Sequence, residues 1–275
     1  MAREEKPAFD LGLGLERTHV MVTGAAGQIG QVITEAFLAA GASVTAVDIK
    51  ESRSRRKDKF MPVQVDISDE QDVAAAFEKA RVVFGGIDCL VHAAGKDLSF
   101  LEQHASNAEM PATQFRETLR VNVEGAFLVC REWLRGLPDC HKSMRNRSLI
   151  VFGSEAGIWG VNNVDYATSK AALHGLVQSF AADPMTIKQG ARVNLIAPGV
   201  VDTPQFRKEV EEDPDDKWKQ LSTVIQAEAV PIQAVARTCL FLASDNFSGS
   251  ITAQTIRVDG GRSGRLFYPD RASIV

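Results

Sequence analysis

The sequence lacks an excess of basic charge and lacks long apolar runs. Its 275 residues carry 31 basic and 35 acidic side chains, giving a formal net charge of -4. Nucleic acids and anionic membranes are usually bound by strongly basic surfaces, so we expect neither as a partner. No run approaches the length of a membrane helix, and the first residues, MAREEKPAFDLGLGLERTHV, place charges where a secretory signal needs an unbroken apolar stretch. We therefore expect a cytoplasmic protein.

Cysteine and histidine are scarce, and neither residue type is clustered. The four cysteines are widely separated and form no C-x-x-C pair, which predicts buried free thiols in a reducing compartment. The five histidines include no pair spaced four residues apart and no cluster with acidic residues. Because a zinc site needs several such ligands converging on one point, we expect no metal site.

Short β-branched runs alternate with longer helical patterns along most of the chain. This alternation predicts right-handed β-α-β units. The expected strands span residues 18–23, 43–48, 61–65, 87–95 (with the strand exit), 148–154, 192–199 and 251–261. We therefore expect an α/β fold with a single doubly wound, Rossmann-type parallel sheet of seven strands and helices on both faces.

The expected helices follow from apolar spacing and from signals at the helix ends. The first helix stops at Gly41, and a capping box formed by Ser68 and Gln71 predicts a second helix to about Phe84. Further helical patterns cover residues 112–137, residues 165–184, and a short stretch that ends near residue 242.

Two segments lie outside this alternation. We interpret residues 1–17 as an N-terminal extension and residues 18–275 as one dinucleotide-binding catalytic domain. Residues 202–230 are rich in charge and follow the carboxyl end of the sixth expected strand, where open α/β sheets bind ligands. This segment is either a mobile substrate lid or a solvated helical insert.

The stretch TGAAGQIG, residues 23–30, joins the first expected strand to the first expected helix. Glycines at such a turn allow positive φ and let phosphate oxygens approach backbone N–H groups, and the helix dipole favours the anion. Gly24, Gly27 and Gly30 do not match the G-x-G-x-x-G spacing, so a purely structural turn remains an alternative.

The choice of cofactor depends on two neighbouring features. Asp48 ends the second expected strand, where a carboxylate binds a ribose diol and repels a 2′-phosphate, although it could also cap the next turn. The run SRSRRKDK, residues 52–59, offers arginines that pair with phosphate, although such a run is usually a solvated loop. We favour NAD(H) and keep NADP(H) as possible.

The stretch SEAGIWGVNNVDYATSK, residues 154–170, carries the chemistry. Tyr166 and Lys170 are one helical turn apart and share a helix face. A free tyrosine has a pKa of about 10, and an ammonium nearby lowers it by stabilising the phenolate. Tyr166 is therefore a candidate general acid/base, with the hydroxyl of Ser154 pointing into the same cleft.

These motifs together resemble the short-chain dehydrogenase/reductase family, in particular its single-domain branch and its fungal members. The resemblance runs from the first expected strand to Gly261. It rests on TGAAGQIG, the pair Asp66-Ile67, HAAG at 92–95, Asn122 in NVEG, Ser154, YATSK, PGVVDT at 198–203 and VDGG at 258–261.

The resemblance implies a role for each matching position. Tyr166 would exchange a proton with a carbinol while hydride passes to or from the nicotinamide, and Lys170 would bind the nicotinamide ribose. Ser154 would hydrogen-bond the substrate oxygen, and Asn122 would hold a water that links Lys170 to solvent. The residues expected to bind the cofactor, besides Tyr166 and Lys170, are Gly24, Gly27, Gln28, Ile29, Gly30, Asp48, Asp66, Ile67, Ala93, Ala94, Gly95, Pro198, Gly199, Val201 and Thr203.

Within this set, Asp66 and Ile67 would flank the adenine, and residues 198–203 would border the nicotinamide. Three positions depart from the family, and one of them, Ala253 in place of a glycine that is common before VDGG, is given no functional weight. Gln28 replaces the middle glycine of the usual turn, a spacing that resembles the longer, epimerase-like branch. Ala93 replaces an asparagine, so side-chain hydrogen bonds that make the adenosine site rigid are lost.

We expect a reversible NAD(P)(H)-dependent oxidoreductase that interconverts a secondary alcohol and a ketone. The alternatives are a non-redox use of the same site, such as epimerisation, dehydration or cyclisation, and a cofactor-sensing protein without turnover. Glu155, Trp159, Val161 and residues 202–230 are expected to line the substrate pocket. Apolar residues on several faces of the helices at 112–137 and 165–183 favour a homotetramer, with a homodimer as second choice.

Overall fold

A seven-stranded parallel sheet forms the centre of the computed structural model, which describes residues 10–96, 101–102, 104, 106–137, 145–160, 163–212 and 229–262. The strand order is β3-β2-β1-β4-β5-β6-β9, and every pair of neighbours is parallel. The strands are β1 (His19–Thr23), β2 (Ser43–Asp48), β3 (Phe60–Gln64), β4 (Cys89–His92), β5 (Ser148–Phe152), β6 (Arg192–Pro198) and β9 (Thr255–Val258). The predicted doubly wound sheet is confirmed.

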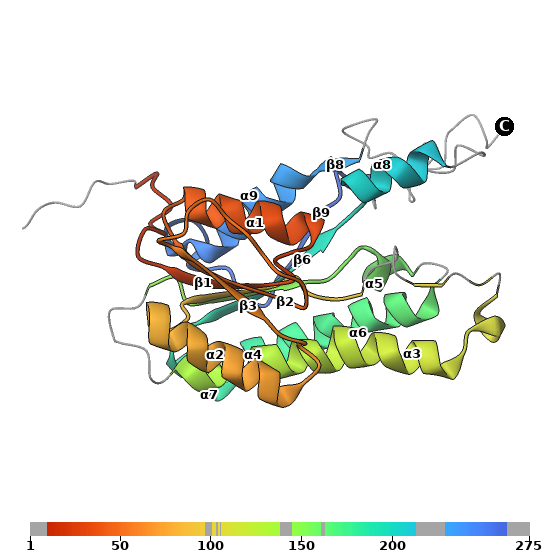
Figure 1. The fold of residues 1–275 in the computed structure, drawn as a ribbon, viewed down its shortest axis with the longest axis horizontal. Coiled ribbons are helices and arrows are strands. Elements are labelled where there is room, and N and C mark those ends of the chain that lie inside the picture. The colour runs from red at the N-terminus through yellow and green to blue at the C-terminus, as the bar shows by residue number, and fades with distance from the viewer. Residues whose placement is uncertain are drawn as a thin grey trace, which may run out of the picture.

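Helices cover both faces of this sheet (Figure 1). On one face lie α1 (Gln28–Ala39) and α9 (Ile232–Ala243), which pack against each other. On the other lie α2 (Glu70–Phe84), α4 (Gly125–Gly136) and α6 (Val164–Ala181). Because successive strand residues point to opposite faces, Leu90 packs in the apolar cluster below α2, α4 and α6, and Val91 packs in the cluster below α1 and α9.

The direction of winding reverses between β1 and β4. From β1 the chain proceeds outward through β2 to β3, and it then returns to pair β4 with the other side of β1. Thr23 and His92 are register partners at the carboxyl ends of these two strands. Open α/β sheets bind ligands beyond such a switch point, so this end of the sheet is where we look for the site.

The start of α2 differs by one residue from the expectation. Asp69, not Ser68, caps the helix: its carboxylate accepts hydrogen bonds from the backbone N atoms of Gln71 at 2.9 Å and Asp72 at 3.0 Å. Ser68 is unavailable because its hydroxyl donates to Asp66 at 2.7 Å. The predicted capping box is therefore wrong, although the helix ends at Phe84 as expected.

The helix expected over residues 112–137 contains a π-helical turn. α3 (Ala112–Leu119) continues into the π-turn η3 (Arg120–Glu124), which continues into α4. Such turns insert an extra residue into the helical ladder and occur often at functional sites. Asn122 lies in this turn and is almost fully buried.

Several shorter elements complete the described chain. α6 ends at Ala181, and Pro184 begins a separate helix that Asp183 caps through the backbone N of Met185 at 2.8 Å. The last strand is shorter than expected because Ala253, just before it, has a φ of 58°. The short helices are η2 (Asn107–Glu109), α5 (Ala156–Trp159), α7 (Pro184–Lys188) and α10 (Asp245–Ser248).

Residues 10–17 of the expected N-terminal extension pack against the amino end of the sheet. Leu15 is fully buried in the cluster below α1 and α9. The carbonyl of Leu13 accepts a hydrogen bond from Ser244 Oγ at 2.6 Å, and the carbonyl of Gly14 accepts one from Asn146 Nδ2 at 2.8 Å. The start of the described chain is thus joined to segments far along the sequence.

Both ends of the segment 202–230 are described. β7 (Val201–Asp202) leads into α8 (Pro204–Glu211) and pairs in parallel with β8 (Val230–Pro231). α8 lies beyond the carboxyl end of β6 (Figure 1). Residues 213–228, the remainder of the expected lid, lie outside the described residues.

Cys89, Cys130 and Cys239 are buried free thiols, as expected, and Cys140 lies outside the described residues. None of the helices in the described ranges combines the length and the apolar character needed to cross a membrane. Across the same ranges, no three histidine, cysteine or acidic side chains converge as metal ligands would.

Candidate active site

The turn between β1 and α1 depends strongly on two of its three glycines. Gly24 has a φ of 72°, and a Cβ atom there would lie 2.7 Å from the backbone N of Ala94. A Cβ atom on Gly30 would lie 2.0 Å from the carbonyl oxygen of Gly24. Gly27 has a φ of -70°, and its Cβ atom would come no closer than 3.2 Å to its neighbours. Gly24 and Gly30 therefore bring β1, α1 and the exit of β4 together.

The amino end of α1 has no side-chain cap. Its first backbone N–H groups and its dipole therefore favour an anion, and the residues present fit a dinucleotide pyrophosphate at this end. Ile29 lies in the first turn of this helix. Gln28 Oε1 accepts a hydrogen bond from the backbone N of Gln205, in the first turn of α8, at 3.3 Å. The residue that replaces the family's glycine thus connects α1 to α8.

Asp48 lies at the end of β2, beside the glycine turn. Its Oδ2 accepts a hydrogen bond from the backbone N of Ala26 at 2.9 Å, and its Oδ1 accepts one from the backbone N of Lys50 at 2.9 Å. The second bond is the local cap that the sequence offered as an alternative. A carboxylate has about four acceptor positions, so both oxygens retain capacity for a ribose diol.

The basic run at 52–59 is partly engaged with its surroundings. Arg53 forms an ion pair with Glu51 at 2.7 Å, and Arg56 donates to the carbonyl of Leu38 at 3.0 Å. Arg53 and Arg55 also border a cavity of about 590 Å³ between this loop and α1. The run is therefore neither a freely solvated loop nor an organised phosphate clamp.

The two residues expected beside an adenine, Asp66 and Ile67, make different kinds of contact. Asp66 Oδ1 accepts hydrogen bonds from the hydroxyl and the backbone N of Ser68, which together with the charge of Arg120 hold the pKa of Asp66 below its usual value. Ile67 is 5% exposed, and a Cβ atom on Gly125 would lie 3.0 Å from its Cδ1. The side chain of Ile67 thus supports the start of α4.

Thr23 holds the HAAG segment at the exit of β4. Its Oγ1 is hydrogen-bonded to His92 Nδ1 at 2.9 Å and accepts a bond from the backbone N of Ala94 at 3.3 Å. The backbone N of Ala93 donates to the carbonyl of Thr23 at 3.2 Å. These bonds position the segment even though Ala93 has no polar side chain.

His92 is buried close to Lys170. Burial, followed by the nearby charge of Lys170, lowers the pKa of His92 to about 3. The imidazole is therefore neutral at physiological pH. Its Nε2 has no hydrogen-bond partner among the described residues.

Tyr166 and Lys170 lie on the same face of α6. Both are largely buried, at 8% and 7% exposure. Lys170 Nζ lies 5.6 Å from the centroid of the Tyr166 ring and donates a hydrogen bond to the carbonyl of Phe152 at 3.0 Å. The ammonium is thus held between the end of β5 and the phenol ring.

Asn122 connects the π-turn to this pair. Its Oδ1 accepts from the backbone N of Lys96 at 2.7 Å, and its Nδ2 donates to the carbonyl of Lys96 and to Ser169 Oγ, both at 3.0 Å. A Cβ atom on Gly95 would lie 3.0 Å from Asn122 Oδ1 and 3.7 Å from Lys170 Nζ. Gly95, Asn122 and Lys170 are therefore immediate neighbours.

Ser154 lies on the turn between β5 and α5. Its Oγ accepts a hydrogen bond from the backbone N of Ala156 at 3.1 Å. A Cβ atom on Gly157 would lie 2.6 Å from the backbone carbon of Lys170, so α5 is packed directly on α6. This contact fixes the turn that carries Ser154 relative to Lys170.

Asp165 is a site residue that the sequence interpretation missed. It is fully buried, and its carboxylate accepts hydrogen bonds from Thr118 Oγ1 at 2.8 Å and from the backbone N of Tyr166 at 2.8 Å. It therefore joins α3 to the start of α6, directly before Tyr166. An acidic residue in the first turn of a helix was the available signal.

The segment expected to border the nicotinamide leaves β6 and enters α8. Pro198 and Val201 are buried, and Gly199 is half-buried. Thr203 Oγ1 accepts a hydrogen bond from the backbone N of Phe206 at 3.1 Å and so caps α8. The structure thus places residues 198–203 at the carboxyl end of the sheet, with Thr203 engaged locally.

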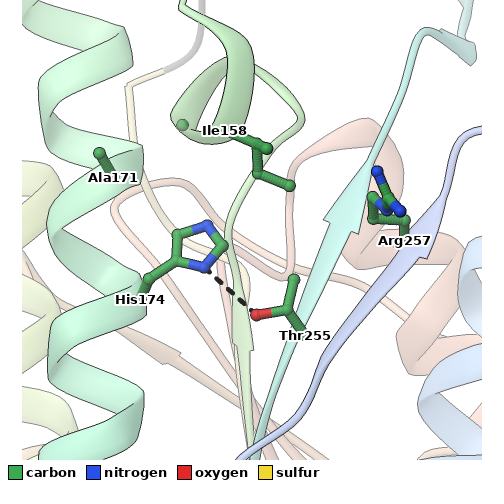
Figure 2. A pocket seen from close by; sticks show the side chains of 6 residues that line it. Ile158, Ala171, His174, Thr255 and Arg257 are labelled. Atoms are coloured by element: carbon green, nitrogen blue, oxygen red, sulfur yellow. Dashed lines mark hydrogen bonds between the residues drawn. The ribbon is translucent and has the colours of Figure 1, made fainter. Parts of the chain in front are cut away.

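A separate cavity of about 420 Å³ lies between α5, α6 and β9 (Figure 2). His174 and Thr255 meet there through a hydrogen bond of 3.2 Å, and burial lowers the pKa of His174. None of the four expected catalytic side chains lines this cavity. Of the expected substrate-pocket residues, Trp159 is 41% exposed and Val161 lies outside the described residues.

Known proteins share this fold over nearly their whole length. A family model described as enoyl-(acyl carrier protein) reductase matches residues 24–263. A (+)-cis,cis-nepetalactol synthase, NEPS3, from Nepeta racemosa is 32% identical over 257 residues, which cover 90% of this chain and 92% of the relative. The 3-oxoacyl-(acyl-carrier-protein) reductase FabG of Thermotoga maritima is 31% identical over 256 residues, covering 90% and 98%.

Among solved structures, the ligand-free aldohexose dehydrogenase of Thermoplasma acidophilum matches with a TM-score of 0.78 at 27% identity, covering 93% of this chain and 98% of that one. The sheet, the glycine turn and the matches define a Rossmann-fold oxidoreductase that acts on small molecules. The chain belongs to the short-chain dehydrogenase/reductase family, whose members generally use NAD(P)(H).

Proposed function

We propose that the protein is a reversible NAD(H)-dependent oxidoreductase that interconverts a secondary alcohol and a ketone. The observation that supports this most is the grouping of Asn122, Tyr166 and Lys170 at the switch point of the sheet, next to an uncapped helix end. When bound, the nicotinamide supplies or accepts the hydride. The protein then has to bind and orient the substrate and the cofactor, and to exchange one proton with the substrate oxygen.

Tyr166 is the general acid/base in this proposal. In the direction of ketone reduction its hydroxyl protonates the developing alkoxide, and in alcohol oxidation its phenolate removes the carbinol proton. Lys170, with its ammonium 5.6 Å from the phenol ring centroid, stabilises the phenolate electrostatically. Ser154 donates a hydrogen bond to the substrate oxygen, and Asn122 links Lys170 to solvent through a water.

Cofactor selection rests on the end of β2. Asp48 faces the glycine turn, where its negative charge binds a ribose diol and opposes a 2′-phosphate. Arg53, one candidate for a phosphate ligand, pairs with Glu51. These contacts support NAD(H) over NADP(H).

Binding measurements test this proposal directly. In calorimetric titrations we expect NADH to bind at least about tenfold more tightly than NADPH, followed by NADH-dependent reduction in a screen of cyclic and aromatic ketones. The reverse preference would transfer cofactor selection to the arginine run. Failure of both nucleotides to bind would remove the proposed function.

A second candidate is non-redox chemistry in the same site. It is supported by one specific finding: a relative at 32% identity is named a nepetalactol synthase. In that case bound NAD(H) would serve as a scaffold for cyclisation, epimerisation or dehydration. Product formation without any net change in NADH absorbance would distinguish this candidate from the first.

The overall organisation is part of the proposal. Residues 18–275 form one catalytic domain after an extension at 1–17, and the segment 202–230, including α8, acts as a lid over the substrate. The chain assembles through α3–α4 and α6 as a homotetramer or, failing that, a homodimer in the cytoplasm. Phe127, 43% exposed on α4, supports this interface, and light scattering of Phe127→Ser tests it.

A further inference from the structure

The last described residues of the chain meet the turn that carries Ser154. Arg262 Nη1 donates a hydrogen bond to Glu155 Oε1, and the two side chains form an ion pair. The side chains are only 22% and 15% exposed, respectively, so this pair is much less solvated than a surface ion pair. Glu155, which the sequence analysis expected in the substrate pocket, directs its carboxylate toward Arg262, shortly after β9.

Three strand exits converge around this pair. The backbone N of Glu155 donates to the carbonyl of Pro198 at 3.0 Å, which joins the exit of β5 to that of β6. The backbone N of Gly199 donates to the carbonyl of Val258 at 3.0 Å, which joins β6 to β9. Pro198 and Gly199, at the start of the segment 198–203, are therefore held from both sides.

Gly199 lies in the middle of this contact. A Cβ atom there would lie 2.9 Å from Asp259 Cβ and 3.2 Å from Glu155 Oε2, so the backbone is closely packed between two acidic side chains. Arg262 pairs with one of them, Glu155, through its guanidinium. Its backbone N donates to the carbonyl of Asp259 at 3.1 Å, which fixes the arginine beside the acidic pair.

Burial makes the loss of either charge of the Glu155–Arg262 pair costly. Burial raises the pKa of Glu155, Asp259 adds to that rise, and Arg262 opposes it. Removing one partner of a poorly solvated ion pair leaves the other charge uncompensated, which is more costly than breaking a pair in water. Loss of Arg262 would therefore favour protonation of Glu155 or movement of its carboxylate toward solvent, and both outcomes remove the ionic link to the segment after β9.

We propose that the Glu155–Arg262 pair is a positioning device, which holds the Ser154 turn and residues 198–203 at the spacing that the nicotinamide end of the cofactor requires. This inference rests on the proposed function. Neither side chain takes part in proton transfer. The consequence is that the segment directly after β9 sets the geometry of the turn that carries Ser154.

The decisive probe is ADP-ribose, which keeps the adenosine and both phosphates of NADH but lacks the nicotinamide. For Arg262→Met and Glu155→Gln we expect the Kd of NADH to rise about fivefold to tenfold, while the Kd of ADP-ribose stays within about twofold. Arg262→Lys keeps the charge and should recover most of the NADH affinity. Arg81→Met is the matched control, since Arg81 also pairs with glutamates, on α2 and α4, and should change neither affinity.

A cofactor-free measurement separates this inference from the proposed function. Backbone amides 199–203 should exchange hydrogen at least about fivefold faster in Arg262→Met and Glu155→Gln than in the wild type and in Arg81→Met. If the wild type binds neither NADH nor ADP-ribose, the proposed function fails, and amide exchange alone decides on the pair. Equal weakening of both nucleotides, unchanged binding of both, or unchanged amide exchange would each overturn the positioning role.

Discussion

On the α6 side of the site, the amide of Asn122 bonds to Ser169 and to both backbone groups of Lys96, and the ammonium of Lys170 is held at the end of β5. On the α1 side, the helix begins without a side-chain cap, and the carboxylate of Asp48 bonds to the backbone of its own neighbourhood. The first group of residues is joined by bonds among its own members, whereas the start of α1 offers backbone N–H groups that no side chain caps.

This difference between the α6 side and the α1 side predicts which residues act in the chemical step and which bind the cofactor. Groups that act on developing charge are most effective when they need no rearrangement at the moment of reaction. A binding surface, in contrast, gains affinity from groups whose partners arrive with the ligand. The α6 side is therefore expected to respond to substitution in turnover, and the α1 side in cofactor affinity and selectivity.

The largest expected effect is on the α6 side. Tyr166→Phe removes the exchangeable proton and keeps the ring beside Lys170, so turnover should fall about 10³-fold while the Kd of NADH changes less than about twofold. Steady-state kinetics and titration measure the two quantities. Residual turnover within about tenfold of the wild type would remove Tyr166 from the role of acid/base.

The next effect concerns the backbone of the α1 side. Gly30→Ala forces a methyl group into the carbonyl of Gly24, so the free energy of unfolding should fall by about 1–3 kcal/mol and NADH affinity should fall with it. Gly27→Ala is the matched control, because its Cβ atom would meet a single backbone atom at 3.2 Å, a far milder contact than the 2.0 Å at Gly30, and the φ suits alanine. Urea denaturation measures both variants, and equal losses would show that the close approach at Gly30 is unimportant.

A smaller effect is expected at the end of β2. Asp48→Ala removes the charge that opposes a 2′-phosphate, so the ratio of kcat/KM for NADPH to that for NADH should rise at least about tenfold. Adding Arg53→Met to Asp48→Ala tests whether the arginine run binds the 2′-phosphate, through the change in the same ratio of kcat/KM values. An unchanged ratio in Asp48→Ala would show that Asp48 does not select the cofactor.

The smallest effect is expected where the chain departs from its family. Gln28→Gly restores the usual glycine and removes one exposed hydrogen bond of 3.3 Å to α8, so the KM for NADH should change by no more than about threefold. Gln31→Gly, one turn further along α1, is the comparison variant. A loss of NADH binding in Gln28→Gly alone would make Gln28 an essential cofactor ligand.

The succession of strands and helices along the chain could be predicted because both follow from local apolar periods. The cap of α2 could not be assigned correctly, because Ser68 and Asp69 are equally good caps by type and only the bond from Ser68 to Asp66 separates them. The π-turn at Asn122 adds one residue to a helix without changing its composition, so the apolar spacing of residues 112–137 does not reveal it.

The candidate site likewise contains contacts that could be predicted from the sequence and contacts that could not. Tyr166 and Lys170 could be paired from their spacing on one helix, and this pairing is local. The bond between Asn122 and Ser169 joins two different helices, and the pair Glu155–Arg262 joins the two sides of β6. Contacts of this kind depend on how the whole sheet closes, and no short pattern in the sequence encodes them.

The bond between Leu13 and Ser244 bears on the order in which the protein is made. Leu13 leaves the ribosome before most of the chain has been translated. Its carbonyl bonds to a hydroxyl that is synthesised 231 residues later. Strands β1 to β5 and α9 all precede Ser244 in the chain, so this contact can form only after they have been translated. A chain that stops before Ser244 would therefore lose the bond at Leu13, while the bond from Asn146 to the carbonyl of Gly14 could still form.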